Sequence, residues 1–93
     1  MMDFKVGDYV CFINEAAYTG RAEDWLATYK IKDSLKKAWT SYSPKKNECG
    51  TIMAINPLEC GDWGKSSFGE YGIYVLSDEG KGYLVDENDI RSK

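Results

Sequence analysis

The chain contains no histidine, and it has only three cysteines. Without imidazole it lacks the commonest general acid/base and the usual partner of a nucleophilic serine or cysteine. The cysteines, Cys11, Cys49 and Cys60, form no CxxC pair, which argues against a disulfide framework and a zinc site. We therefore expect a protein that is not an enzyme and that needs no metal, cofactor or small-molecule substrate.

Long apolar runs are also missing. None approaches the roughly 20 residues that a membrane-spanning helix requires. The first ten residues, MMDFKVGDYV, lack the order of a basic stretch followed by an apolar one that marks a signal peptide. These two absences predict no membrane association and a cytoplasmic location.

Tyrosine and tryptophan, in contrast, are plentiful. Aromatic residues make up 14% of the 93 residues, and ten of the thirteen are tyrosine or tryptophan. Such side chains combine a large apolar area with a polar tip, so they suit surfaces that bind other proteins as well as cores. The length predicts one domain spanning residues 1–93.

Several short apolar segments with turn residues between them predict a mainly β protein. Residues 4–13, FKVGDYVCFI, read as a turn that leads into a strand, and residues 49–55, CGTIMAI, as a second strand ended by Asn56 and Pro57. In this second strand Ile52 and Ala54 are expected on one face, with Met53 and Ile55 on the other. Residues 72–76, GIYVL, and 83–85, YLV, flank a polar turn and predict a hairpin. A single helical turn is expected at residues 87–90.

A longer insertion separates the first two predicted strands, at about residues 15–47. Its apolar positions within residues 22–39 have helical spacing, which predicts one helix or two short ones. Asp33 could cap a second helix, whereas residues 29–32 alternate like a strand, so the pattern leaves both readings open.

The order of these segments resembles that of the small SH3-like β-barrels, including KOW, Tudor and related bacterial and phage modules. The similarity lies in VGDYV near the start, GTIMAI in the middle, and YGIYVLSDEGKGYLVDENDI at the end, about half of the chain. It implies a barrel of about five strands in which the two ends of the chain meet, with the helical insertion between strands 1 and 2. It concerns the fold and not an activity.

The stretch CGDWGKSSFGEYG, residues 60–72, looks at first like a phosphate-binding loop. Such a loop needs a glycine five positions before Gly64, and that position holds Glu59, whose carboxylate would repel a phosphate. The glycines that follow also disfavour the helix that must start there. A strand connection is the better interpretation, and its aromatic residues could either pack or contact a partner.

Cysteine chemistry offers little else. Cys11 lies in the first predicted strand and is interpreted as a small core residue. Cys49 and Cys60 flank the second predicted strand, too far apart along it to bond.

Aromatic residues of the insertion and of this connection are the predicted contacts with a protein partner, since one small core cannot easily bury all of them. They are Trp25, Tyr29, Trp39, Tyr42, Trp63, Phe68 and Tyr71.

Lysines dominate the charge of residues 30–46, with six lysines against one acid, which leaves −8 for the remainder of a chain of net charge −3. Such a block could hold the phosphates of a nucleic acid, although lysines on a helix usually only solvate its outer side. The predicted contacts are Lys36, Lys37, Lys45 and Lys46. The acids near the C-terminus could keep that region soluble, meet a basic partner or imitate a run of DNA phosphates. They are Asp78, Glu79, Asp86, Glu87 and Asp89.

Together these features predict a non-enzymatic module that binds another protein. By resemblance, this would be a small phage or bacterial accessory protein that inhibits or redirects a host factor. Nucleic-acid binding through the lysine-rich insertion is the alternative hypothesis.

Overall fold

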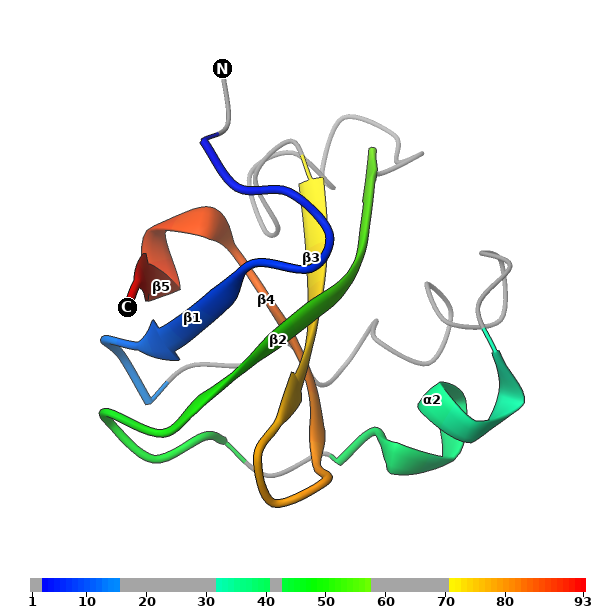
Figure 1. Ribbon diagram of the computed structural model, residues 1–93. Coiled ribbons are helices and arrows are strands. Elements are labelled where there is room, and N and C mark those ends of the chain that lie inside the picture. The colour runs from blue at the N-terminus through cyan, green and yellow to red at the C-terminus, as the bar shows by residue number, and fades with distance from the viewer. Residues whose placement is uncertain (1–2, 16–31, 41–42, 58–70) are drawn as a thin grey trace, which may run out of the picture.

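The computed structural model describes residues 3–15, 32–40, 43–57 and 71–93. Its five strands are β1 (Tyr9–Phe12), β2 (Cys49–Pro57), β3 (Tyr71–Ser77), β4 (Gly82–Val85) and β5 (Ile90–Ser92). They form one antiparallel sheet in the order β4-β3-β2-β1-β5 (Figure 1). The expectation of a mainly β fold is therefore confirmed. The two ends of the chain also meet, because β1 pairs with β5.

The sheet is open. In the described residues β4 and β5 are its two edges, and no strand pairing joins them. A closed barrel is thus not confirmed. The edge at β4 is partly covered, since Trp39 forms a parallel bridge with Gly82 and the Thr40 N–H donates a 3.0 Å hydrogen bond to the Gly82 carbonyl.

One face of the sheet carries the main hydrophobic core. Every strand contributes to it, and the aromatic rings of Phe12 and Tyr83 meet edge to face with their centroids 5.3 Å apart. Phe4 and Ile55 pack against the cluster from its rim. Burial of this apolar surface is the main force that holds the strands together. The buried members are Val10, Phe12, Ile52, Ile73, Val75, Tyr83, Val85 and Ile90.

A β-bulge in β2 corrects the expected assignment of its faces. Ile52 pairs with Val75 and Ala54 with Tyr74, so Met53 is an extra residue between two pairs. An extra residue reverses the alternation of side chains that follow it. Ile52 and Ile55 consequently both reach the core, and Met53 is exposed. β2 also continues through Asn56 and Pro57, which the sequence pattern had placed after its end.

Two tight turns have residues suited to a positive φ, Gly80 and Asn47, at the positions that require it. The hairpin between β3 and β4 closes with the Gly80 N–H donating to the Ser77 carbonyl and the Ser77 N–H to the Lys81 carbonyl. Gly80 has a φ of 83°, the left-handed conformation that a three-residue hairpin loop needs and that glycine adopts without a steric penalty. The predicted hairpin is confirmed. A similar turn precedes β2, where the Glu48 N–H donates to the Lys45 carbonyl and Asn47 has a φ of 70°.

The expected helical turn near the C-terminus is also present. The 3-10 helix η1 (Glu87–Asp89) begins with a capping box, in which the Asp86 side chain accepts from the Asn88 N–H and the Asp89 side chain accepts from the Asp86 N–H. Ile90 follows it and is 4% exposed, as expected of a residue that fills the core. The residues after η1 form β5 and do not simply trail from the domain.

Of the predicted insertion, the structure describes one short helix, α2 (Asp33–Ala38). Its N-cap is Lys32, which makes no side-chain cap hydrogen bond, so Asp33 lies in the first turn and is not the cap. A carboxylate in the first turn still favours the helix through its dipole. Tyr74, fully buried on the side of the sheet away from the main core, donates its hydroxyl hydrogen to the Leu35 carbonyl and so ties α2 to β3. Residues 16–31 lie outside the described residues.

A disulfide joins β1 to β2, contrary to the expectation that the thiols would be free. Cys11 and Cys49 are direct cross-strand neighbours, and their sulfur atoms are 2.01 Å apart. The sequence pattern missed the bond because Cys11 and Cys49 are 38 residues apart and only the strand register brings them together. Disulfides persist in oxidising compartments and are rare in the cytoplasm. The cytoplasmic location stays a prediction. Whether Cys11 and Cys49 are bonded in the cell would test it, because a cytoplasmic protein would keep both thiols reduced.

We expect reduction of this disulfide to lower the free energy of unfolding by about 4 kcal/mol, since it closes a loop of 38 residues and restricts the unfolded chain. Urea unfolding with and without reductant measures the difference. Cys60→Ser is the matched control and should unfold like the native chain. Without reductant, the unfolded protein should have one reactive thiol, that of Cys60. Reaction of all three cysteines would contradict the bond.

Gly50 lies where the backbones of β2 and β3 approach each other closely. A Cβ at this position would lie 2.7 Å from the Ser77 Cα and 2.8 Å from the Leu76 carbonyl carbon, both backbone atoms that cannot move aside alone. We expect Gly50→Ala to destabilise the fold by about 3 kcal/mol or more. Gly80→Ala, where a Cβ meets nothing within 4 Å, should cost only about 1 kcal/mol for its positive φ. Equal midpoints in urea for the two variants would contradict this close approach of β2 and β3.

Candidate binding surface

The face of the sheet opposite the core carries one aromatic and two basic side chains at β1 and β5. Alternation places Val10, Phe12 and Ile90 in the core, so Tyr9 and Arg91 point to the other side. The strand register sets Arg91 beside Cys11, and the Lys93 N–H donates to the Tyr9 carbonyl. Tyr9 is 39% exposed, and Arg91 and Lys93 are exposed. We call these three residues the β5 surface.

Tyr9 occupies the centre of this surface. The Lys93 ammonium lies 5.3 Å from the centroid of its ring, within the range of a cation–π interaction. At the other end of the ring, the Tyr9 hydroxyl donates to the Asp78 carboxylate. That hydrogen bond raises the pKa of Tyr9, because ionisation would lose the bond and set two negative charges together. The surface is therefore cationic at β5 and acidic toward the β3–β4 hairpin.

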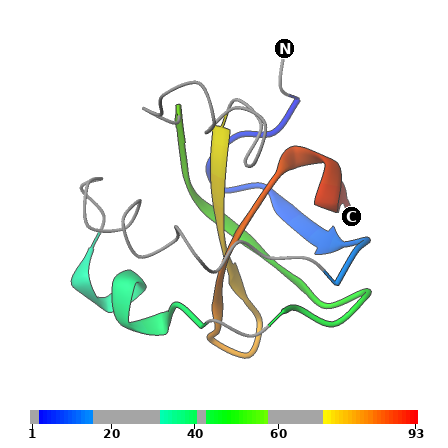
Figure 2. The ribbon, with the colours of Figure 1, turned by 180° about the vertical axis from the view of Figure 1, so that it is seen from behind.

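The predicted lysine contacts fall into two groups. Lys36 and Lys37 lie on α2, where Lys37 is exposed and Lys36 half-buried. Lys45 and Lys46 are exposed in the turn before β2. Figures 1 and 2 show α2 on one side of the sheet and the turn before β2 on the opposite side, together with β5. The structure therefore does not bring the four lysines into one patch.

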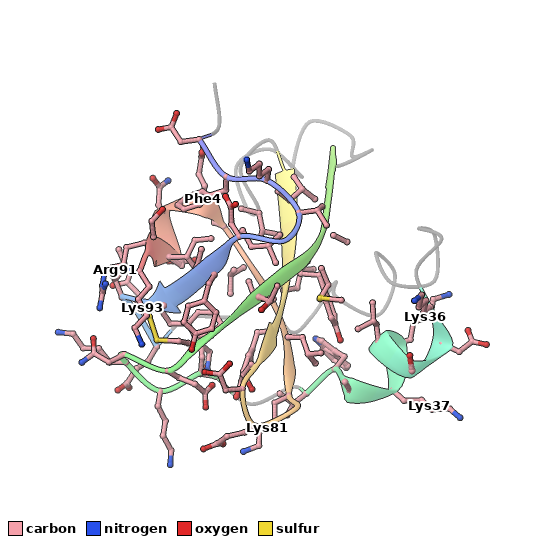
Figure 3. All side chains as sticks on the ribbon, viewed as in Figure 1. Phe4, Lys36, Lys37, Lys81, Arg91 and Lys93 are labelled. Carbon is pink, nitrogen blue, oxygen red and sulfur yellow. A yellow bond between two sulfur atoms is a disulfide. The ribbon has the colours of Figure 1, made fainter. Side chains whose placement is uncertain are left out.

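Lys45 and Lys46 lie instead on the same side of the molecule as Arg91 and Lys93. The Asn47 N–H donates to the Phe12 carbonyl, and Phe12 pairs with Ile90 at the start of β5. Only β1 separates the turn from β5, which is about 10 Å across two strand spacings. Figure 3 shows Arg91 and Lys93 together on this side, with Lys36 and Lys37 on the other.

Two of the seven aromatic residues predicted to contact a partner lie in the described part of the chain. Trp39 is half-buried at the end of α2, and its indole Nε1 is buried with no hydrogen-bond partner among the described residues. Tyr71 is the first residue of β3. The other five, Trp25, Tyr29, Tyr42, Trp63 and Phe68, lie outside the described residues, as does most of the glycine-rich stretch at residues 60–72.

Four of the five acids near the C-terminus make contacts within the chain, and Glu87 is exposed. Asp78 accepts from Tyr9, Glu79 lies 3.8 Å from the Lys81 ammonium, and Asp89 also accepts from the Asn14 side-chain amide. Asp86 belongs to the capping box of η1. Within residues 3–15, 32–40, 43–57 and 71–93, no group of three or more Cys, Asp or Glu could hold a metal ion. The same residues include no helix long and apolar enough to cross a membrane.

Sequence reasoning missed the β5 surface itself. The signal was present, because Arg91 and Lys93 alternate with Ser92 after the apolar Ile90, as in a strand with one buried face. Three residues are too few for such a pattern to identify a strand on its own. Pairing with β1 makes the segment a strand and sets both cations beside Tyr9.

Comparison with known proteins adds no relative: the chain matches no family model, no curated protein and no solved structure. Its function has to be inferred from its own residues.

One polar pair lies on the core side of the sheet, formed by buried Tyr83 and half-buried Glu48. The hydroxyl of Tyr83, which is 2% exposed, hydrogen-bonds to the Glu48 carboxylate, whose Oε2 is buried with no partner in the described part. Burial, followed by this hydrogen bond and the negative charge of Glu48, raises the pKa of Tyr83 to about 12. Burial also raises the pKa of Tyr74 to about 12.

We expect these two tyrosines to ionise last. Because folding favours their neutral forms, their contribution to stability is complete below about pH 10 and is lost as the pH rises through about 12. Tyrosinate absorbance at 295 nm, followed against pH in the folded protein, should show a late step that Tyr83→Phe reduces. In 8 M urea all tyrosines should ionise near pH 10. A native titration with no late step would contradict the burial of both hydroxyls.

Proposed function

We propose that this chain is a non-enzymatic module that binds another protein. The observation that supports this most directly is the β5 edge, with which no further strand of the described residues pairs and beside which lie the exposed side chains of Tyr9, Arg91 and Lys93. An edge strand has backbone donors and acceptors that a second chain can pair with, and aromatic and arginine side chains are frequent in protein interfaces.

We extend the proposal to the fold: a small SH3-like barrel that stays open between β4 and β5. Support comes from the order of five antiparallel strands, from β1 lying between β2 and β5, and from the 3-10 turn that connects β4 to β5. The half-buried Trp39, which borders the β4 edge, fits a module whose insertion adds to the contact area. With that resemblance goes the role of an accessory protein that inhibits or redirects a host factor.

Nucleic-acid binding is the second hypothesis, favoured by the exposure of Lys45 and Lys46 on the same side as Arg91 and Lys93. Against it stand the net charge of −3 and the position of Lys36 and Lys37 on the other side of the molecule. A long polyanion gains affinity from many cations in a continuous track, and the surrounding acids would repel it.

Affinity capture tests the proposed function. The folded chain, immobilised and exposed to an extract of the cells that produce it, should retain a protein that binds again when purified, with a 1:1 stoichiometry by isothermal titration calorimetry. The matched control is the Gly50→Ala chain, expected to fold poorly and to lose this partner. Recovery of nucleic acid alone, or of no protein that rebinds, would contradict the proposal.

A further inference from the structure

We propose that the β5 edge accepts an extended, acidic segment of the partner as an additional strand, with acidic residues at alternate positions opposite Arg91 and Lys93. This rests on the proposed function and names the chemistry of the partner. Three properties of the described residues support it: the direction of the backbone groups of β5, the charges beside them, and the difference between the two edges of the sheet.

On one side, the backbone of β5 pairs with no other strand of the described residues. The Ile13 N–H donates to the Asp89 carbonyl and the Lys93 N–H to the Tyr9 carbonyl, so residues 89, 91 and 93 face β1. In an antiparallel pair the intervening residues turn their N–H and C=O groups the other way. Ile90 and Ser92 therefore direct these groups away from β1, and in the described part of the chain no further strand pairs with them.

The other edge differs. At β4, the Thr40 N–H already uses the Gly82 carbonyl, and Trp39 bridges to the same residue. The chain thus covers one edge with its own residues 39–40, whereas β5 ends the described sheet with exposed Arg91, Ser92 and Lys93. Of the two edges of the described sheet, β5 is therefore the one whose backbone groups an additional strand can pair with.

The charges of Arg91 and Lys93 favour an acidic strand as the one that pairs with β5. Arg91 and Lys93 project to the same face, two residues apart, so a strand paired with β5 would place its own residues i and i+2 beside them. Opposite charges at directly facing positions stabilise a pair of strands and like charges destabilise it. The same two cations would oppose pairing with β5 of a second copy, which is how charged side chains protect short edge strands.

Nearby acids limit the length of the segment. Glu87 is exposed just before β5, Asp89 is held by Asn14 and by the backbone of Asp86, and Asp78 lies beyond Tyr9. Among the described residues, Lys45 and Lys46 add two further cations on this side. A short acidic segment can follow Arg91 and Lys93 without meeting these carboxylates, whereas a long polyanion would meet them.

Two peptides of identical composition test the proposal by fluorescence anisotropy with the full chain: fluorescein-SEVEVS-amide, with alternating acids, and fluorescein-SEEVVS-amide, with adjacent acids. The alternating peptide should bind at least tenfold more tightly, and added NaCl should weaken its binding. Equal affinities, or no binding of either, would overturn the proposal.

Matched charge reversals locate the site. Arg91→Glu with Lys93→Glu should weaken binding of the alternating peptide at least tenfold, whereas Lys36→Glu with Lys37→Glu, the same change of charge on α2, should leave it within twofold. Thermal unfolding followed by circular dichroism checks that both variants fold. Equal losses in the two variants would indicate a nonspecific charge effect and overturn the proposal.

Backbone pairing is checked separately by NMR. The amides of Ile90 and Ser92 should exchange with solvent more slowly when the alternating peptide is bound, whereas the Arg91 amide, already bonded to β1, should change little. Unchanged exchange at Ile90 and Ser92 would overturn strand addition.

A fluorescein-labelled 20-nucleotide oligo(dT) tests nucleic acid as the ligand of the same surface. The proposal would be overturned in favour of nucleic acid if this oligonucleotide bound more tightly than the alternating peptide and lost affinity when Arg91 and Lys93 were changed to glutamate.

Failure here is distinguishable from failure of the proposed function. A captured partner whose binding tolerates the change at Arg91 and Lys93 would leave the protein-binding function standing and remove only the acidic strand at β5.

Discussion

The pairing of β1 with both β2 and β5 holds the fold together. The four residues of β1 connect the beginning of the chain to its middle at β2 and to its end at β5. Val10 and Phe12 enter the core, and Tyr9 and Cys11 lie on the opposite face. The core face supplies the hydrophobic stabilisation, and the outer face receives the disulfide and the ring beside Lys93. A shift of register by one residue would exchange these faces and separate both features.

The disulfide and the β5 surface are consequences of the same pairing. Cys11 faces Cys49 on one side and Arg91 on the other, so the covalent link fixes the position of β1 next to the strand that carries the cations. On the outer face, Tyr9 lies between a cation and an acid. Its ring contacts Lys93 next to β5, and its hydroxyl donates to Asp78 in the hairpin. This separation of charge on a chain that is acidic overall limits the cationic region to a short stretch of the edge, which suits a short acidic partner segment.

Local patterns were informative where the structure depends on local chemistry. The Gly80 turn, the hairpin around it and the helical turn before Ile90 each require particular residues at short spacing, and each is present as expected. The faces of β2 were predicted wrongly because a bulge at Met53 is decided by how two strands fit together, and the alternation of a single strand does not encode it. The lysines were expected to act together because they are close in sequence, yet the fold directs α2 and the turn before β2 to opposite sides.

The order of residues alone was enough to establish that the protein is mainly β, that its strands are short with glycine at the sharp turns, and that apolar residues near both ends form the core. These properties follow from backbone preferences and hydrophobic alternation, which act over a few residues. The folded arrangement was needed to show that Cys11 bonds to Cys49, that residues 90–92 form an edge strand, and that Arg91 and Lys93 share a surface with Tyr9. Each of these joins residues tens of positions apart, and such contacts are set by strand order and register across the whole sheet.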